Sequence, residues 1–177
     1  MLPARAWGDQ VSTHYLAEAQ LLVQGVDLCQ LLSPEDFALA GISGANKPVS
    51  NSMPSTDFYC LYAGLSSYKG GIELDAFLSQ SKPEATQVFM TVTQEHLGRN
   101  PLDRARQLGV DQASMKLKAK GYSATFATIA VQSGRLVFVI GFPSNPQAEV
   151  QLMSLAEKVL QRARNLTKES RPRLNRT

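Results

Sequence analysis

The sequence predicts an α+β domain in which a mostly antiparallel, five-stranded sheet is flanked by helices. Two kinds of periodicity support this prediction: short segments that alternate apolar and polar residues, and longer segments with apolar residues at helical spacing. Short turns between the expected strands favour antiparallel neighbours. The expected element order is α-α-β-β-α-β-β-β-α, which corresponds to a two-layer or three-layer sandwich.

The first half of the chain is expected to hold two helices, a loop and a hairpin. Ser33 is a typical N-cap and Pro34 suits the first helical position, so a short helix should begin there and stop at Gly41. The last strand of this half alternates apolar and polar residues, which predicts that one of its faces is buried. We expect helices over residues 9–24 and 34–41, a loop over 42–56, and hairpin strands over 57–63 and 72–77.

The second half is expected to hold three strands and two longer helices. The segment 136–142 is apolar on both faces, which predicts a central strand. The segment 147–166 carries the clearest apolar stripe in the chain and predicts an amphipathic helix. We expect helices over 83–96 and 147–166, a helical turn over 102–108, and strands over 113–118, 122–131 and 136–142.

The length of 177 residues suits one domain, which we expect over residues 1–166. Residues 161–177 hold six basic residues and one acid, which gives this segment a charge of +5. Because the net charge of the chain is +3, residues 1–160 carry about −2. A slightly acidic body argues against nucleic-acid binding. The basic tail over 167–177 is expected to be flexible and to make at most weak contact with a membrane surface. No stretch reaches the ~18 apolar residues of a transmembrane span.

The only two cysteines, Cys29 and Cys60, are expected to form a disulfide. In the chain-entropy model, closing this loop removes roughly 3–4 kcal/mol of unfolded-state entropy. The alternative is a pair of buried thiols that act as small hydrophobic side chains. Zinc prefers about four N or S ligands, and the chain adds only the dispersed His14 and His96, so we expect no metal site. A Cys-x-x-Cys redox motif is absent.

The segment Asp27-Leu-Cys29-Gln-Leu-Leu-Ser33-Pro-Glu35, followed by Gly41, resembles the opening of a family of exported actinobacterial lipoproteins of unknown function. The family pattern is roughly Asp-x-Cys-x-Leu-Leu-Ser/Thr-x-x-Glu, then a glycine and a second cysteine with an aromatic residue two positions on. Cys60-Leu-Tyr62 fits that second part, and Leu108-Gly109-Val110-Asp111-Gln112-Ala113 partly matches a later Gly-Leu-Gly-Asp-x-Ala pattern. The resemblance covers about residues 25–165 and implies an exported domain without enzyme activity.

Several patterns are similar to catalytic motifs. Ser66-Ser-Tyr-Lys69 and Ser79-Gln-Ser-Lys82 match the Ser-x-x-Lys pattern of acyl-enzymes, but Lys-Thr-Gly and Ser-Asp-Asn companions are absent. His14 and His96 are the only imidazole bases, and their helical positions favour surface or capping roles. These patterns do not predict catalysis.

A carboxylate pair is the remaining candidate. Glu73 and Asp75 share one face of an expected strand, and such a pair can do acid–base work or hold calcium. No further ligands are apparent beside them, so we expect a solvated strand face. We therefore predict a chain that is not an enzyme and holds no cofactor or metal.

The sequence favours a non-catalytic, exported binding module of the periplasm or cell envelope, with an unknown protein or a small envelope ligand as partner. One alternative is a periplasmic immunity or inhibitor protein, and the other is an enzyme with an unrecognised site. A pocket with convergent titratable groups would favour the enzyme, and an exposed patch would favour the inhibitor. No complete signal peptide is recognisable, so the expected export depends on the cysteines and the resemblance.

Any binding surface is expected on the 42–56 loop and the neighbouring turn over 64–71. Polar, aromatic and cationic side chains gather there, a mixture common at interaction surfaces. The disulfide would clamp the segment that holds this loop, so the loop would stand on a rigid base. The residues expected on this surface are Asn46, Lys47, Asn51, Tyr62, Tyr68 and Lys69.

Overall fold

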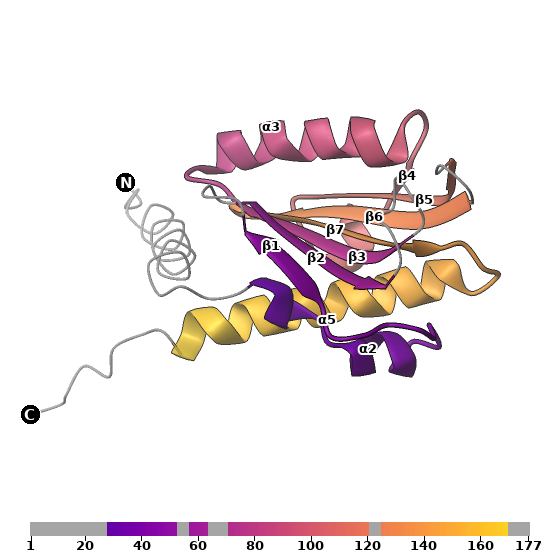
Figure 1. Cartoon of the computed structure of the whole chain (residues 1–177). Helices are drawn as coiled ribbons and strands as arrows, with labels where there is room; N and C mark the ends of the chain where they lie inside the picture. Colours follow the sequence, from indigo (N-terminus) through magenta and orange to yellow (C-terminus); the bar gives the residue numbers. More distant parts are fainter. Residues whose placement is uncertain (1–27, 53–56, 64–70, 121–124, 170–177) are drawn as a thin grey trace, which may run out of the picture.

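The computed structural model describes residues 28–52, 57–63, 71–120 and 125–169, which form a three-layer α+β sandwich (Figure 1). One antiparallel sheet is the middle layer. The helix α3 (Lys82–Val92) lies on one face of the sheet, and α5 (Ala148–Glu169) lies on the other. The predicted fold class, an antiparallel sheet flanked by helices, is confirmed. The helix expected over residues 9–24 lies outside the described residues.

The sheet has the strand order β1-β2-β3-β7-β6-β5-β4, with antiparallel neighbours throughout. The predicted number of five strands is wrong, because six strands have four or more residues and β4 adds a two-residue strand. Both additional strands, β1 and β4, are short and lie at the edges. The strands are β1 (Val49–Ser52), β2 (Asp57–Ala63), β3 (Ile72–Leu78), β4 (Leu102–Asp103), β5 (Gln112–Lys120), β6 (Thr125–Ser133) and β7 (Leu136–Pro143).

The strand β1 lies inside the segment that was expected to be a loop. Its sequence, Val-Ser-Asn-Ser, has no apolar alternation, so no local pattern identifies it as a strand. Pairing with β2 creates it, with Val49 opposite Leu61 and Ser52 opposite Phe58. The hydrogen-bonding edge of β2 therefore decides the structure of this segment rather than its own propensity.

The strand β7 is central, as predicted, and is buried on both faces. Val137 and Val139 pack with residues of α3, whereas Phe138 and Ile140 belong to the larger core beneath α5. Successive side chains of a strand point to opposite faces, so one apolar run fills both layers of core.

Four short helical segments complete the described part of the fold: η1 (Leu28–Leu31), α2 (Pro34–Leu39), η2 (Thr93–Leu97) and α4 (Ala105–Leu108). Ser33 caps α2 as predicted, and it forms a capping box with Asp36. The helix expected over 83–96 is present as α3 followed by the π-helical turn η2. The region 102–108 forms β4 and α4, and α5 extends to Glu169.

The predicted disulfide between Cys29 and Cys60 is present and joins η1 to β2. Tyr62, two residues along β2, points to the same face and is 1% exposed. Its hydroxyl oxygen lies 3.0 Å from the backbone carbonyl oxygen of Cys29 and 2.9 Å from that of Leu32, and its single proton can be donated to either. Its prediction as a surface residue is therefore wrong, because it closes the core beneath η1.

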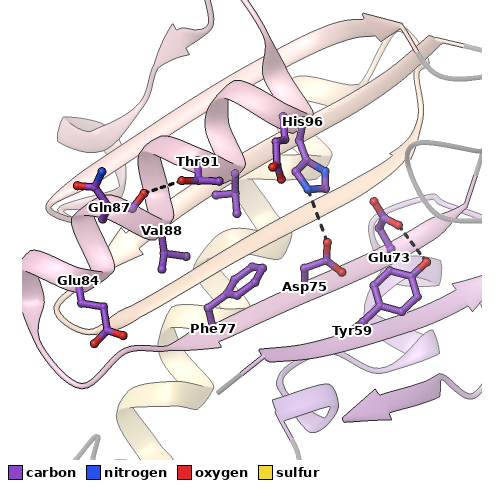
Figure 2. Close-up of a pocket in the computed structure, with 11 residues that line it drawn as sticks. Tyr59, Glu73, Asp75, Phe77, Glu84, Gln87, Val88, Thr91 and His96 are labelled. Carbon is purple, nitrogen blue, oxygen red and sulfur yellow. Dashed lines mark hydrogen bonds and ion pairs between the residues drawn. The ribbon is translucent and has the colours of Figure 1, made fainter. Parts of the chain in front are cut away.

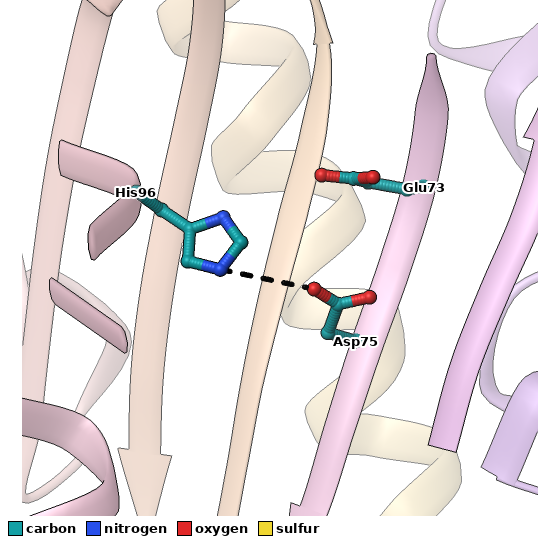
Figure 3. Close-up of side chains that lie close together, drawn as sticks. All are labelled: Glu73, Asp75 and His96. Atoms are coloured by element: carbon teal, nitrogen blue, oxygen red, sulfur yellow. Dashed lines mark ion pairs between the residues drawn. The ribbon is translucent and has the colours of Figure 1, made fainter. Parts of the chain in front are cut away.

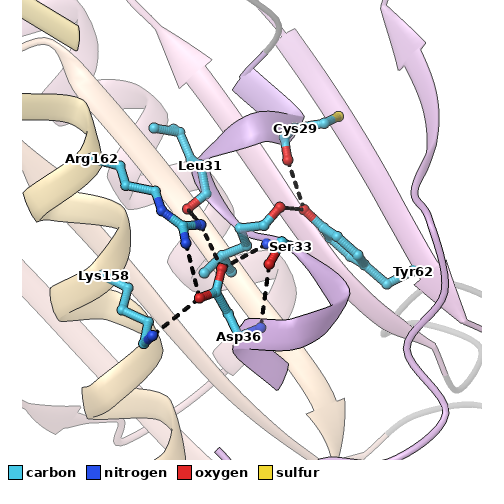
Figure 4. Close-up of polar contacts among 8 residues, drawn as sticks. Cys29, Leu31, Ser33, Asp36, Tyr62, Lys158 and Arg162 are labelled. Carbon is cyan, nitrogen blue, oxygen red and sulfur yellow. Dashed lines mark hydrogen bonds and ion pairs between the residues drawn. The ribbon is translucent and has the colours of Figure 1, made fainter. Parts of the chain in front are cut away.

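A buried carboxylate, Asp36, fastens α2 to α5 (Figure 4). It accepts hydrogen bonds from Lys158 at 3.1 Å and from the guanidinium of Arg162, and it accepts from the backbone amide of Ser33 at 2.8 Å. Burial alone would raise the pKa of Asp36, but the bonds from Arg162, Ser33 and Lys158 together hold this pKa below its ordinary value. Arg162, counted with the basic residues of the 161–177 segment, is thus part of the folded body.

The disulfide should contribute substantially to stability. Replacing Cys29 and Cys60 with alanine should lower the free energy of unfolding by about 3–4 kcal/mol, because the unfolded chain regains loop entropy. Urea denaturation of the parent and the double variant measures this difference. A thiol titration of denatured, unreduced parent protein should find no free thiol, and two free thiols in material from an oxidising compartment would contradict the pairing.

Asp36 should make the fold sensitive to acid. A carboxyl group whose pKa is lower in the folded state stabilises the fold above its unfolded pKa of about 3.9, and this stabilisation is lost as pH falls through the folded pKa. Asp36→Asn should cost about 2 kcal/mol at neutral pH, since it removes hydrogen bonds to a charged acceptor. Urea denaturation from about pH 6 to pH 3 should show the parent and variant converging. A constant difference across that range would contradict this role.

Candidate functional site

A pocket of about 570 Å³ lies between the β2–β3 side of the sheet and the helical layer of α3 and η2 (Figure 2). Strand side chains form its floor and helix side chains form its opposite wall. The floor consists of Tyr59, Glu73, Asp75 and Phe77, and the wall consists of Glu84, Gln87, Val88, Thr91, Val92, Glu95 and His96.

The floor of the pocket follows from the alternation of β3. Leu74 and Ala76 point into the larger core, so Glu73, Asp75 and Phe77 point toward α3. Glu73 is 0% exposed and Asp75 is 7% exposed. Because β3 pairs with β2 on one side and β7 on the other, these two carboxylates are held on a strand that cannot shift easily.

The neighbours of Glu73 explain how a carboxylate fits here. Its partner on β7 is Gly141, which has no side chain to occupy the space above the sheet. The partner of Asp75 on β2 is Tyr59, and the Tyr59 hydroxyl donates to Glu73 Oε2 at 3.3 Å. The tyrosine therefore orients one carboxylate of the pair from the neighbouring strand.

His96 reaches the pocket from the end of the helical layer. The segment η2 is a wider, π-helical turn, and the amide of Gly98 donates to the carbonyl of Thr93, five residues back, at 3.2 Å. Gly98 ends the turn with φ +64° and ψ −137°, a conformation that is available essentially only to glycine. The His96 imidazole, whose side chain is 9% exposed, thereby faces β3.

The three titratable side chains meet at one place (Figure 3). Ligand-capable atoms of Glu73, Asp75 and His96 all lie within 4.8 Å of one another, and His96 Nε2 is 3.9 Å from Asp75 Oδ2. Burial lowers the pKa of His96, and nearby Glu95 opposes this effect only in part. The lowered pKa favours the neutral imidazole, whose ring can offer a nitrogen lone pair.

The charge of the pocket is one-sided. Four of its lining residues are Asp or Glu, and none of the described lining residues is Lys or Arg. Two of these acids, Glu73 and Asp75, are buried, where solvent screens their charge weakly. The pocket is suited to a positively charged ligand.

The roles expected for these three residues from the sequence are wrong. Glu73 and Asp75 were expected on a solvated strand face, and His96 on a surface or at a helix cap, yet all three are largely buried. The sequence does contain a signal for this burial, because it predicts two longer helices, over 83–96 and 147–166. When each helix covers one face of the sheet, both faces are buried. A strand in the middle of such a sheet has no solvated face.

The residues predicted for a binding surface are not brought together in the described structure. Asn46 and Lys47 are exposed in the loop before β1, and Tyr62 is buried. Asn51 lies in β1, and its side chain is not described; Tyr68, Lys69, Ser66 and His14 lie outside the described residues. Of the other motif residues, Ser79 is buried, and Lys82 forms an ion pair with Asp111.

Comparisons with protein-family models, with curated proteins and with solved structures found no match to this chain. Across the part of the chain that the structure describes, no helix is both long enough and apolar enough to cross a membrane.

Neutralising a pocket carboxylate should not destabilise the fold as neutralising Asp36 does. In the absence of ligand, Asp75→Asn should change the free energy of unfolding by less than about 1 kcal/mol or raise it, because it relieves repulsion between buried like charges. Asp36→Asn is the matched control, since it makes the same change at a similarly buried position. Urea denaturation at neutral pH compares the two variants. A loss of about 2 kcal/mol or more in Asp75→Asn would instead make Asp75 a structural group.

Proposed function

We propose that this chain is an exported, non-catalytic binding module whose pocket beneath α3 takes a positively charged ligand. The observation that carries this proposal is the pair of buried carboxylates, Glu73 and Asp75, at the floor of a pocket with two further acids in its wall.

The energetic argument concerns the cost of burying these charges. Removing a carboxylate from water costs several kcal/mol even after the protein relaxes, and a second carboxylate nearby adds repulsion. A cation bound between Glu73 and Asp75 would be attracted by both carboxylates and would reduce the repulsion between them. Tyr59 and Phe77 add aromatic surface, which attracts cations through the electrostatics of the ring.

Export is supported by the disulfide and by the resemblance to exported lipoproteins. Disulfides persist in oxidising compartments and are rare in the cytosol, so the Cys29–Cys60 bond is compatible with an extracytoplasmic location. In such a compartment the pocket would meet ligands of the envelope or the medium.

An enzyme remains the second candidate, because a pocket with convergent titratable groups is typical of an active site. Carboxylates on the floor and an imidazole in the wall could carry acid–base chemistry. The immunity or inhibitor alternative has less support, because the site is a pocket rather than an exposed patch. We prefer binding to catalysis because attraction between a cation and the pocket carboxylates requires only their charge.

Cations should stabilise the protein, and size-matched neutral or anionic compounds should not. Thermal melts of the full chain with butylammonium, tetramethylammonium, Mg²⁺, Ca²⁺ and Zn²⁺ should show at least one rise of several degrees, while butanol and butyrate should show none. A ligand at a hundred times its Kd adds about 2.7 kcal/mol of stability, which is large enough to detect in this way.

A pair of charge-matched double variants locates the effect. Glu73→Gln with Asp75→Asn should abolish the cation response, whereas Asp103→Asn with Glu157→Gln, which removes two exposed acids outside the pocket, should leave it intact. A response that survives in the pocket variant, or the absence of any cation response in the parent, would overturn the proposal. Turnover of a bound compound would support the enzyme instead.

A further inference from the structure

We propose that Glu73, Asp75 and His96 bind a divalent transition-metal ion, with zinc as the expected metal (Figure 3). This inference rests on the proposed function, because it identifies the cation that the pocket takes. It also differs from the expectation drawn from the sequence, in which the two cysteines, His14 and His96 are too dispersed to form a zinc site.

The geometry is close to that of a metal site. Zinc binds His nitrogen and carboxylate oxygen at about 2.0–2.2 Å, so ligand atoms around a tetrahedral ion lie roughly 3.3–3.6 Å apart. The atoms of Glu73, Asp75 and His96 already lie within 4.8 Å of one another, with 3.9 Å between His96 Nε2 and Asp75 Oδ2. A contraction of about 1 Å would close the set, and rotations of these side chains can supply it.

Two elements of different character supply the ligands. Glu73 and Asp75 stand two residues apart on β3, on one face of a strand that is paired on both sides. His96 comes from the π-helical turn η2 on the opposite wall. An ion held between them would bridge the sheet to the helical layer, and it would do so where the wall is built from a single wide turn.

The donor set favours a transition metal over calcium or magnesium. Calcium takes six to eight oxygen ligands, and magnesium keeps several waters around one or two carboxylates. An imidazole with two carboxylates suits zinc, and three protein ligands leave a further position for water or another ligand. Because the pocket extends along the floor to Phe77, that position has room on the pocket side.

The residues around Glu73 resemble the outer groups that orient the ligands of a metal site. The Tyr59 hydroxyl donates to Glu73 and would orient this carboxylate toward an ion. Gly141, opposite Glu73 on β7, keeps the sheet face beside the ligands free of a side chain. Both cysteines are in the disulfide, so no thiolate competes for zinc elsewhere in the chain.

Isothermal titration of the metal-stripped, oxidised full chain with Zn²⁺ tests this site. One Zn²⁺ ion per chain should bind more tightly than Mg²⁺ or Ca²⁺. His96→Gln should weaken zinc binding more than about 100-fold, because losing a ligand should exceed the 10–100-fold effect of losing an outer partner. Tyr59→Phe should weaken it by about 10–100-fold. His14→Gln is the matched control, since it removes the only other histidine of the chain, and it should leave the affinity unchanged.

Co²⁺ supplies a readout that does not depend on affinity. Visible absorption of the Co²⁺-loaded parent should show the intense bands of a low-coordinate site, and His96→Gln should lose them while its thermal melt stays cooperative. Zinc binding that is equally tight in His96→Gln, or that is lost in His14→Gln, would overturn the metal site. If butylammonium or tetramethylammonium stabilises the chain through Glu73 and Asp75 but Zn²⁺ does not bind, the metal inference fails and the proposed function stands. If no cation binds, both fail.

Discussion

One antiparallel sheet covered on both faces is the constraint on which the rest of this domain depends. With α3 on one face and α5 on the other, side chains of the central strands must be buried whichever way they point. The strand β7 meets this requirement with apolar residues on both faces. The strand β3 is apolar on the face toward α5, but on the face toward α3 it carries Glu73 and Asp75. The pocket lies where the sequence departs from the apolar pattern that the fold demands.

Buried carboxylates in this domain occupy two different electrostatic environments. Asp36 receives hydrogen bonds from Arg162 and Lys158, so its charge is compensated within the chain and it ties α2 to α5. Glu73 accepts a hydrogen bond from the Tyr59 hydroxyl, and Asp75 lies 3.9 Å from the imidazole of His96. Buried titratable groups that converge in a pocket are more common at functional sites than elsewhere. The convergence of two carboxylates and an imidazole in one pocket is the observation on which the proposed ligand depends.

Local patterns in the sequence predicted the parts of the fold that local interactions determine. The cap at Ser33, the central β7 and the apolar stripe of α5 are of this kind. The strand β1 was missed because its polar residues become a strand only by pairing with β2. Tyr62 is expected at the surface as an aromatic contact beside the predicted turn over 64–71, although period two puts it on the same face as Cys60. Glu73 and Asp75 were placed in solvent because alternation along one strand does not reveal what covers its polar face.

The way each wall of the pocket is held bears on how a ligand would bind. The strand β3 is hydrogen-bonded on both sides at the centre of the sheet, so Glu73 and Asp75 are positioned before any ligand arrives. The helical wall is anchored by Phe89, Val92 and Leu97, which pack on Val137 and Val139 of β7, and Gly98 ends its wide turn immediately after His96. Groups carried on such rigid elements lose little entropy on binding. A cation would therefore meet ligand atoms that are already close together and that need only side-chain rotations to close around it.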